Sequence, residues 1–188
     1  MHTRITLTIV CAGLFALSAC TKSADCPEPE VKAEDPVQRG QFMVTVGGCN
    51  DCHTPKNMTP QGPVPDMSRM LSGHPSGEPV APYDKNTVGP WVLLSPGLTC
   101  AVGPWGTSFA ANLTPSESGI GSWSEEQFVK ALQEGKHMGM DNTRPIMPPM
   151  PWQEIGKFDV NDLKAIYAYL KSIPPVDNVV PAYMPPVQ

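Results

Sequence analysis

Charged residues are scarce in this chain of 188 residues, at 16%, with 13 lysines and arginines against 18 aspartates and glutamates. This low fraction excludes a coiled coil or a long charged helix. A basic excess is also lacking, which excludes a nucleic-acid-binding module. The uncharged stretch near the N-terminus, residues 5–19, has only 15 residues and is shorter than the ~20 that cross a bilayer. What remains is one small domain with many loops.

Proline and glycine are abundant, since 23 prolines and 16 glycines make up about a fifth of the chain against an ordinary ~12%. Each proline removes a backbone donor and fixes φ, so the composition predicts turns and extended loops. Residues 54–112 hold ten prolines in 59 residues and form too long a stretch for an idle loop. We expect this segment to wrap around a fixed centre; the alternative is a partly mobile insertion.

The N-terminal segment has the pattern of an export signal, in which Arg4 precedes the uncharged run. Its ending, Leu17-Ser18-Ala19-Cys20, is similar to the bacterial lipoprotein signal, where small residues precede a lipidated cysteine. The alternative is an ordinary signal peptide cut nearby. We predict a signal peptide over residues 1–19 and a lipidated acidic tether over residues 20–35. The expected location is the periplasmic side of a bacterial membrane, with lipid at Cys20 as the anchor.

The cysteines indicate the chemistry, because Cys49-Asn50-Asp51-Cys52-His53 matches the pattern of covalent c-type haem attachment. Two thiols at this spacing reach the two vinyl groups on one side of a porphyrin. The adjacent His53 then becomes the proximal ligand of the iron. One such pattern predicts one haem c.

Two other readings of the cysteine pair are a redox dithiol and half of a zinc site. A thioredoxin-like dithiol requires a βαβ frame, which this proline-rich chain does not predict. A zinc site requires a second close pair of cysteines or histidines, which the sequence lacks. Haem attachment is therefore the leading interpretation.

Three segments have the signals of helices. The first begins at Asp35-Pro36 and stops at Gly47, with aspartate as N-cap and proline at the first helical position. The second begins with a capping box at Ser124 and stops at Gly135. The third runs over residues 159–173 and ends at a pair of prolines.

Five blocks together resemble bacterial class I c-type cytochromes related to the haem subunits of periplasmic dehydrogenases. The match covers residues 37–176. The blocks are Gly106-Thr-Ser-Phe-Ala-Ala-Asn-Leu-Thr-Pro115, Gly119-Ile-Gly-Ser-Trp-Ser-Glu-Glu-Gln-Phe128, Gly135-Lys-His-Met-Gly139, Arg144-Pro-Ile-Met-Pro-Pro-Met-Pro-Trp152 and Asp162-Leu-Lys-Ala-Ile-Tyr-Ala-Tyr-Leu170. The resemblance implies an all-α class I cytochrome c domain over residues 36–176, followed by a proline-rich tail over residues 177–188. It also implies that the first and last helices cross beside the haem, with Gly40 against Tyr169 as the candidate crossing point.

The resemblance implies a sixth iron ligand in a Met-Pro-aromatic turn before the last helix. Met150-Pro151-Trp152 fits this turn, and Met147, which lacks the aromatic residue, is the alternative. His74 and His137 are further alternatives, although both are better read as loop residues held by local hydrogen bonds. A thioether ligand stabilises ferrous iron and implies a comparatively high potential.

Three other features of the sequence have more than one interpretation. Trp105 and Arg144 are placed to contact haem propionates, or are an ordinary core tryptophan and an exposed arginine. Cys26 and Cys100 form a disulfide in an oxidising compartment only if the fold brings them together.

The leading functional expectation is electron transfer by a membrane-tethered monohaem cytochrome that is not itself an enzyme. Expected partners are a dehydrogenase or quinol-oxidising complex as donor, an oxidase or another cytochrome as acceptor, the membrane through lipid, and no nucleic acid. One alternative is a haem sensor or haem enzyme with a displaceable sixth ligand. Another is a structural haem subunit of a larger redox complex.

Overall fold

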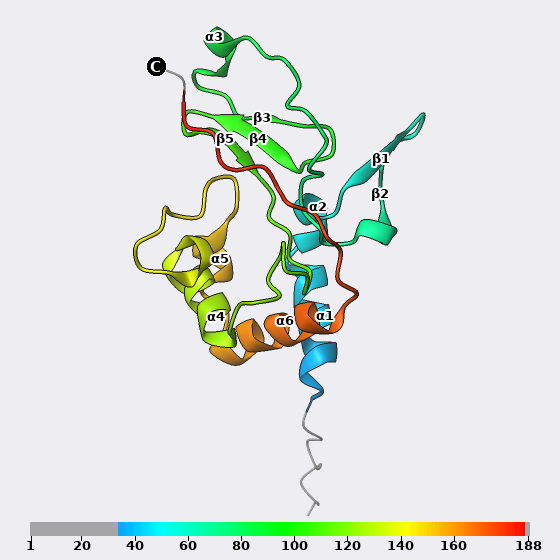
Figure 1. The fold of residues 1–188 in the computed structure, drawn as a ribbon, viewed down its shortest axis with the longest axis vertical. Coiled ribbons are helices and arrows are strands. Elements are labelled where there is room, and N and C mark those ends of the chain that lie inside the picture. The colour runs from blue at the N-terminus through cyan, green and yellow to red at the C-terminus, as the bar shows by residue number, and fades with distance from the viewer. Residues whose placement is uncertain (1–33, 187–188) are drawn as a thin grey trace, which may run out of the picture. The chain divides into compact units, whose positions relative to one another are not determined.

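The computed structural model describes residues 34–186 (Figure 1). The predicted signal peptide, the lipidation site at Cys20 and most of the predicted tether lie outside the described residues. The helices are α1 (Pro36–Val46), α2 (Cys49–His53), α3 (Lys85–Val88), α4 (Glu125–Glu134), α5 (Trp152–Ile155) and α6 (Val160–Ser172), with 3₁₀ turns at Met67–Arg69 and His137–Gly139. The strands are β1 (Lys56–Thr59), β2 (Gly62–Pro65), β3 (Leu93–Leu94), β4 (Cys100–Gly103) and β5 (Gly106–Phe109).

The three predicted helices are confirmed as α1, α4 and α6. The side chain of Asp35 caps α1 by accepting a hydrogen bond from the Val37 amide at 3.0 Å. Ser124 and Gln127 form both bonds of the capping box at the start of α4. Asp159 caps α6 in the same way as Asp35 caps α1.

Helices α1 and α6 cross (Figure 1). Gly40 lies at their contact, opposite Ala165 and Tyr169, as the resemblance implied. A Cβ atom added at Gly40 would lie 1.9 Å from the carbonyl oxygen of Ala165 and 2.7 Å from Cβ of Tyr169. Only glycine permits so close an approach of two backbones. The main hydrophobic core lies where this pair meets α4, and it includes Val44, Phe128, Leu132, Leu163, Ile166 and Leu170.

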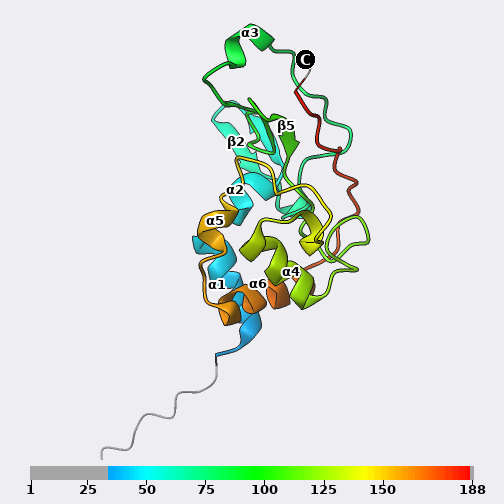
Figure 2. The ribbon, with the colours of Figure 1, turned by 90° about the vertical axis from the view of Figure 1, so that its left-hand side faces the viewer.

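The expectation of an all-α fold is wrong, because the described chain also contains two small antiparallel sheets (Figure 2). β1 pairs with β2, and β3, β4 and β5 form a three-stranded sheet in that order. All five strands lie within residues 54–112, the segment that was expected to be an irregular wrap around the haem. The segment is therefore ordered partly by strand pairing within itself.

The prolines in this segment fall where strands tolerate them. Pro104 lies in the two-residue connection between β4 and β5, and Gly106 follows it with φ 101°. Pro63 and Pro65 lie at alternate positions of β2, where the missing N–H groups point away from its single partner, β1. A high proline count therefore argued against long central strands but not against these short hairpins.

The predicted C-terminal tail, in its described part, returns along the body of the molecule (Figure 1). Thr107 on β5 and Met184 exchange two backbone hydrogen bonds, at 2.8 and 3.0 Å. The side-chain amide of Asn178 donates to the carbonyl oxygens of Ser72 and His74, at 2.7 and 2.8 Å. The tail thus covers the outer edge of β5 and joins the sheet to the segment that follows the first hairpin.

None of the helices between residues 34 and 186 has both the length and the apolar character needed to cross a bilayer.

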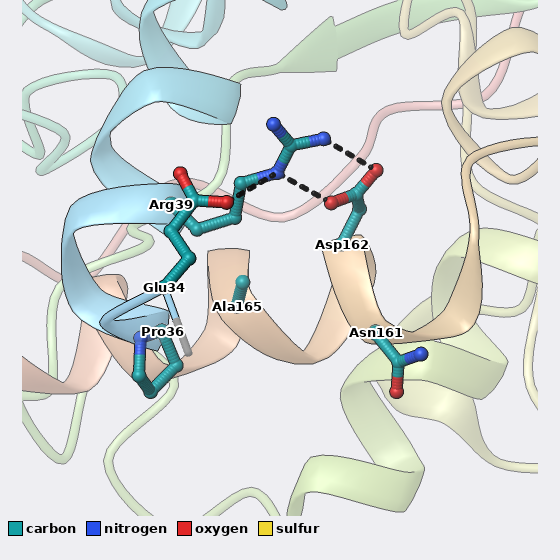
Figure 3. A pocket seen from close by; sticks show the side chains of 6 residues that line it. All are labelled: Glu34, Pro36, Arg39, Asn161, Asp162 and Ala165. Carbon is teal, nitrogen blue, oxygen red and sulfur yellow. Dashed lines mark hydrogen bonds and ion pairs between the residues drawn. The ribbon is translucent and has the colours of Figure 1, made fainter. Parts of the chain in front are cut away.

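A bidentate ion pair joins the starts of α1 and α6 beside a surface cavity of about 420 Å³ (Figure 3). Nε and Nη2 of Arg39 donate to the two carboxylate oxygens of Asp162 at 2.7 and 3.1 Å. The hydrogen bond from Arg39 lowers the pKa of Asp162. The pair therefore stabilises the fold above the carboxyl's unfolded pKa of about 4, and this contribution is lost as the pH falls through the lower folded value.

Replacing Asp162 with asparagine is expected to lower the thermal midpoint at neutral pH, where the carboxylate is charged. The difference from the unmodified protein should shrink to nothing as the pH falls below the folded pKa of Asp162. Glu154→Gln is the control. Glu154 forms an ion pair with Lys157 in which the two side chains are 71% and 68% exposed, and such exposed pairs contribute little to stability. An Asp162→Asn effect that is independent of pH would contradict this account.

Candidate functional site

The predicted haem-attachment residues lie together on α2. This helix begins after Gly48, which has φ 65°, and carries Cys49, Cys52 and His53 within its five residues. The two cysteines are half-buried with free thiols, and the histidine is buried. A glycine between α1 and α2 lets the chain turn through a left-handed conformation that other residues avoid.

The ring of His53 is held in one tautomer by the protein. Its Nδ1 lies 2.7 Å from the backbone carbonyl oxygen of Ala111. A carbonyl only accepts, so Nδ1 carries the proton and the lone pair is on Nε2. Burial lowers the pKa of His53, which keeps the ring neutral. A neutral imidazole whose other nitrogen donates to a backbone carbonyl is the arrangement that metal-binding histidines adopt.

The environment of the two thiols does not suit a redox dithiol. Burial raises the pKa of Cys49 to about 11 and also raises the pKa of Cys52. Reactive dithiols instead have a lowered pKa, because the thiolate is the nucleophile. The zinc reading also lacks support within residues 34–186, where no three metal-ligating side chains of the kind zinc requires lie together.

Two residues that the sequence analysis missed fix α2 in place. Thr54 is fully buried; its hydroxyl donates to the side-chain oxygen of Asn50 at 2.7 Å and accepts from the Leu71 amide at 2.9 Å. The Lys56 ammonium donates to the carbonyl oxygen of Asp51, on α2, at 2.5 Å and to that of Thr54, directly after α2, at 2.9 Å. The position of Thr54 directly after the attachment pattern could have marked it as a residue that supports the site. Nothing in the sequence pointed to Lys56.

The second predicted ligand region is the turn that contains Met147 and Met150. Its start is fixed by a hydrogen bond from the Ile146 amide to the Gly135 carbonyl oxygen at 2.7 Å. Its end is fixed by Trp152, whose ring lies 2.4 Å from where a Cβ on Gly135 would be. Both anchors meet the residue that ends α4, so α4 positions the turn.

The residues present suit a covalently attached haem. Cys49 and Met150 are both partly buried, and both pack against the main hydrophobic core. Met147, the alternative ligand, is also half-buried but is not among the side chains packed on that core. His53 presents a nitrogen lone pair directly after the second cysteine, as haem attachment requires. If a haem is bound, Cys49 and Cys52 would hold it, and His53 and Met150 would bind the iron.

The alternative histidine ligand His74 is engaged elsewhere. Its Nδ1 lies 2.9 Å from the hydroxyl of Thr99 and its Nε2 lies 3.1 Å from the carbonyl oxygen of Glu78. With both ring nitrogens bonded and the side chain buried, this residue is part of the loop structure. Burial also lowers the pKa of His137, the other histidine considered as a sixth ligand, and so favours its neutral form.

The residues expected near haem propionates have partners within the protein. Nε1 of Trp105 donates to the Ser108 hydroxyl at 3.2 Å. The guanidinium of Arg144 lies 5.6 Å from the ring centre of Tyr183, a cation–π distance. Cys100 is buried in β4 with a free thiol, and its suggested disulfide partner Cys26 lies outside the described residues.

No protein-family model matches the chain, but several curated proteins do. The cytochrome c subunit of a quinone-dependent alcohol dehydrogenase from Gluconobacter oxydans is 35% identical over 159 residues, which cover 84% of this chain and 24% of that protein. The cytochrome subunit of a fructose dehydrogenase from Gluconobacter japonicus is 24% identical over 181 residues, or 95% of this chain and 29% of the relative. The cytochrome c subunit of a gluconate 2-dehydrogenase from Pantoea cypripedii is 28% identical over 134 residues, or 71% of this chain and 22% of the relative.

The chain spans less than a third of the length of these relatives. Their names agree with the expectation of a cytochrome that transfers electrons and is not itself the enzyme. The predicted single haem, the lipid anchor and the individual ligands stay predictions. The chain is related to the cytochrome c subunits of bacterial dehydrogenases.

Proposed function

We propose that this protein is a c-type cytochrome that carries single electrons through one haem attached at Cys49 and Cys52. His53 and Met150 are the proposed axial ligands. The observation that carries the proposal is the state of His53: it is buried, neutral and directed by the Ala111 carbonyl oxygen to leave its Nε2 lone pair free. This histidine follows immediately after two free thiols on the same helix.

The haem, when bound, supplies reversible one-electron chemistry at its iron. The chain's own contribution is to hold and tune that group. Hydrogen bonding to Ala111 raises the basicity of the His53 ring and fixes its orientation. Cys49 and Met150 both pack against the main hydrophobic core. This packing would limit the access of water to the proposed haem, and a drier environment shifts the reduction potential of the iron.

The proposed partners follow from the relatives, which are cytochrome subunits of dehydrogenases. We infer a dehydrogenase or a quinol-oxidising complex as electron donor and an oxidase or another cytochrome as acceptor. The proposed location is the periplasmic side of a bacterial membrane. There, lipid at Cys20 and a tether over residues 20–35 would confine the cytochrome domain of residues 36–176 to the membrane surface.

Visible spectra of the purified full chain test the proposal and the choice of ligand. Oxidised protein with methionine on the iron is expected to show a weak far-red band and to bind carbon monoxide poorly after reduction. Met150→Ala should abolish the band and open the iron to carbon monoxide. The matched control is Met147→Ala, in which both properties should persist.

The other outcomes each exclude part of the proposal. A five-coordinate spectrum of the unmodified protein would contradict electron transfer through a closed site and would favour a sensor or enzyme with an open iron. Loss of the band only in Met147→Ala would move the ligand to that residue. A band that survives both substitutions would exclude a ligand from this turn.

A further inference from the structure

The three-stranded sheet that the sequence did not predict contacts the turn that carries the two methionines. The hydroxyl of Ser108, on β5, donates to the carbonyl oxygen of Pro148 at 2.5 Å. Ser108 is buried, with 6% of its surface exposed. Among the described residues, this is the one hydrogen bond that a distant part of the chain makes to residues 147–150.

The turn has few donors of its own, which makes an external bond important. Pro145, Pro148, Pro149 and Pro151 have no N–H group. The amide of Met150 reaches the Met147 carbonyl oxygen only at 3.3 Å, just beyond the usual range of about 2.7–3.2 Å. The turn therefore depends on contacts from outside for its exact position.

The Ser108 hydroxyl is oriented by a second hydrogen bond. It accepts from Nε1 of Trp105 at 3.2 Å. Because a hydroxyl has one proton, the short bond to Pro148 takes it in preference to the carbonyl oxygen of Ala101, which lies 3.5 Å away. The result is a directed chain from the indole through the serine to the carbonyl, in which each bond strengthens the next.

We propose that Ser108, oriented by Trp105, is a positioning residue for the axial methionine. By fixing the Pro148 carbonyl, it holds the backbone between Met147 and Met150 and so determines how firmly Met150 binds the iron. This inference rests on the proposed function, since it requires a haem with Met150 as ligand. It gives the sheet a role in that site and gives Trp105 a function other than contact with a propionate.

Removing the hydroxyl should weaken the methionine–iron bond without detaching the haem. Ser108→Ala removes the partner that the Pro148 carbonyl and the Trp105 indole have within the protein. Loss of one such hydrogen bond changes an equilibrium constant by about tenfold. We expect imidazole, which competes for the sixth position of the oxidised iron, to bind about tenfold more tightly to the variant. Trp105→Phe keeps an aromatic ring but removes the donor, and its effect should have the same direction and be smaller.

The experiment titrates imidazole into oxidised full-chain protein and follows the loss of the far-red band. The matched control is Ser95→Ala, since the Ser95 hydroxyl accepts from the Cys100 amide at 3.2 Å beside the same sheet and has no hydrogen bond to residues 147–150 among those described. Ser95→Ala should bind imidazole as the unmodified protein does. If circular dichroism shows that Ser108→Ala is unfolded, the imidazole titration of Trp105→Phe decides whether this hydrogen-bond chain positions Met150.

Two failures are distinguishable. If the unmodified protein has no far-red band, the proposed function fails before Ser108 is considered. If the band is present but Ser108→Ala and Trp105→Phe bind imidazole no more tightly than Ser95→Ala, the positioning role of Ser108 is overturned and the proposed function stands.

Discussion

Gly40→Ala is expected to lower the free energy of unfolding by about 3 kcal/mol, at the upper end of the cost of overpacking. The added Cβ would lie 1.9 Å from the carbonyl oxygen of Ala165, so the backbones of α1 and α6 would have to separate. Separation would disturb the core packing of Val44 and Leu163. Urea denaturation followed by far-ultraviolet circular dichroism measures the loss.

Gly77→Ala is the matched control for this substitution. A Cβ at Gly77 meets nothing within 4 Å, so the change should stay within about 0.5 kcal/mol of the unmodified protein. If the two variants unfold at the same urea concentration, α1 and α6 do not approach as closely as Gly40 indicates.

The second large effect concerns the covalent attachment of haem. In the unmodified protein, haem should resist extraction by acidified acetone, and the intact mass should exceed that of the processed polypeptide by one haem. In the double variant Cys49→Ala/Cys52→Ala, all haem should be extracted, because no thiol remains on α2 to form a thioether bond. Each single variant should retain haem through the remaining bond.

Cys100→Ala is the control for the attachment experiment, because Cys100 is the other described cysteine with a free thiol. It lies buried in β4, away from α2 in sequence, and its loss should leave attachment intact. Retention of haem by the double variant, or a mass increase of more than one haem, would contradict single attachment through α2.

The sequence alone determined the three longest helices, α1, α4 and α6, and the haem-attachment pattern, because the signals involved are local. Each cap at Asp35, Ser124 and Asp159 lies within three residues of the amide it binds. The attachment pattern occupies five consecutive residues on α2. Such features depend on short-range contacts, so these three helices could be predicted and the attachment pattern located before the fold was known, whereas the four-residue helices α3 and α5 were not predicted.

Only the tertiary structure decided the sheets, and with them the fold class. Short strands rich in proline and glycine have weak local preferences, and their pairing depends on which segments meet. The partners of the site residues are also distant: Ala111 is 58 residues from His53, and Pro148 is 40 residues from Ser108. Ala111 acts through its backbone carbonyl, which every residue has. No side-chain pattern therefore marked it in advance, and folding alone brought it to the histidine.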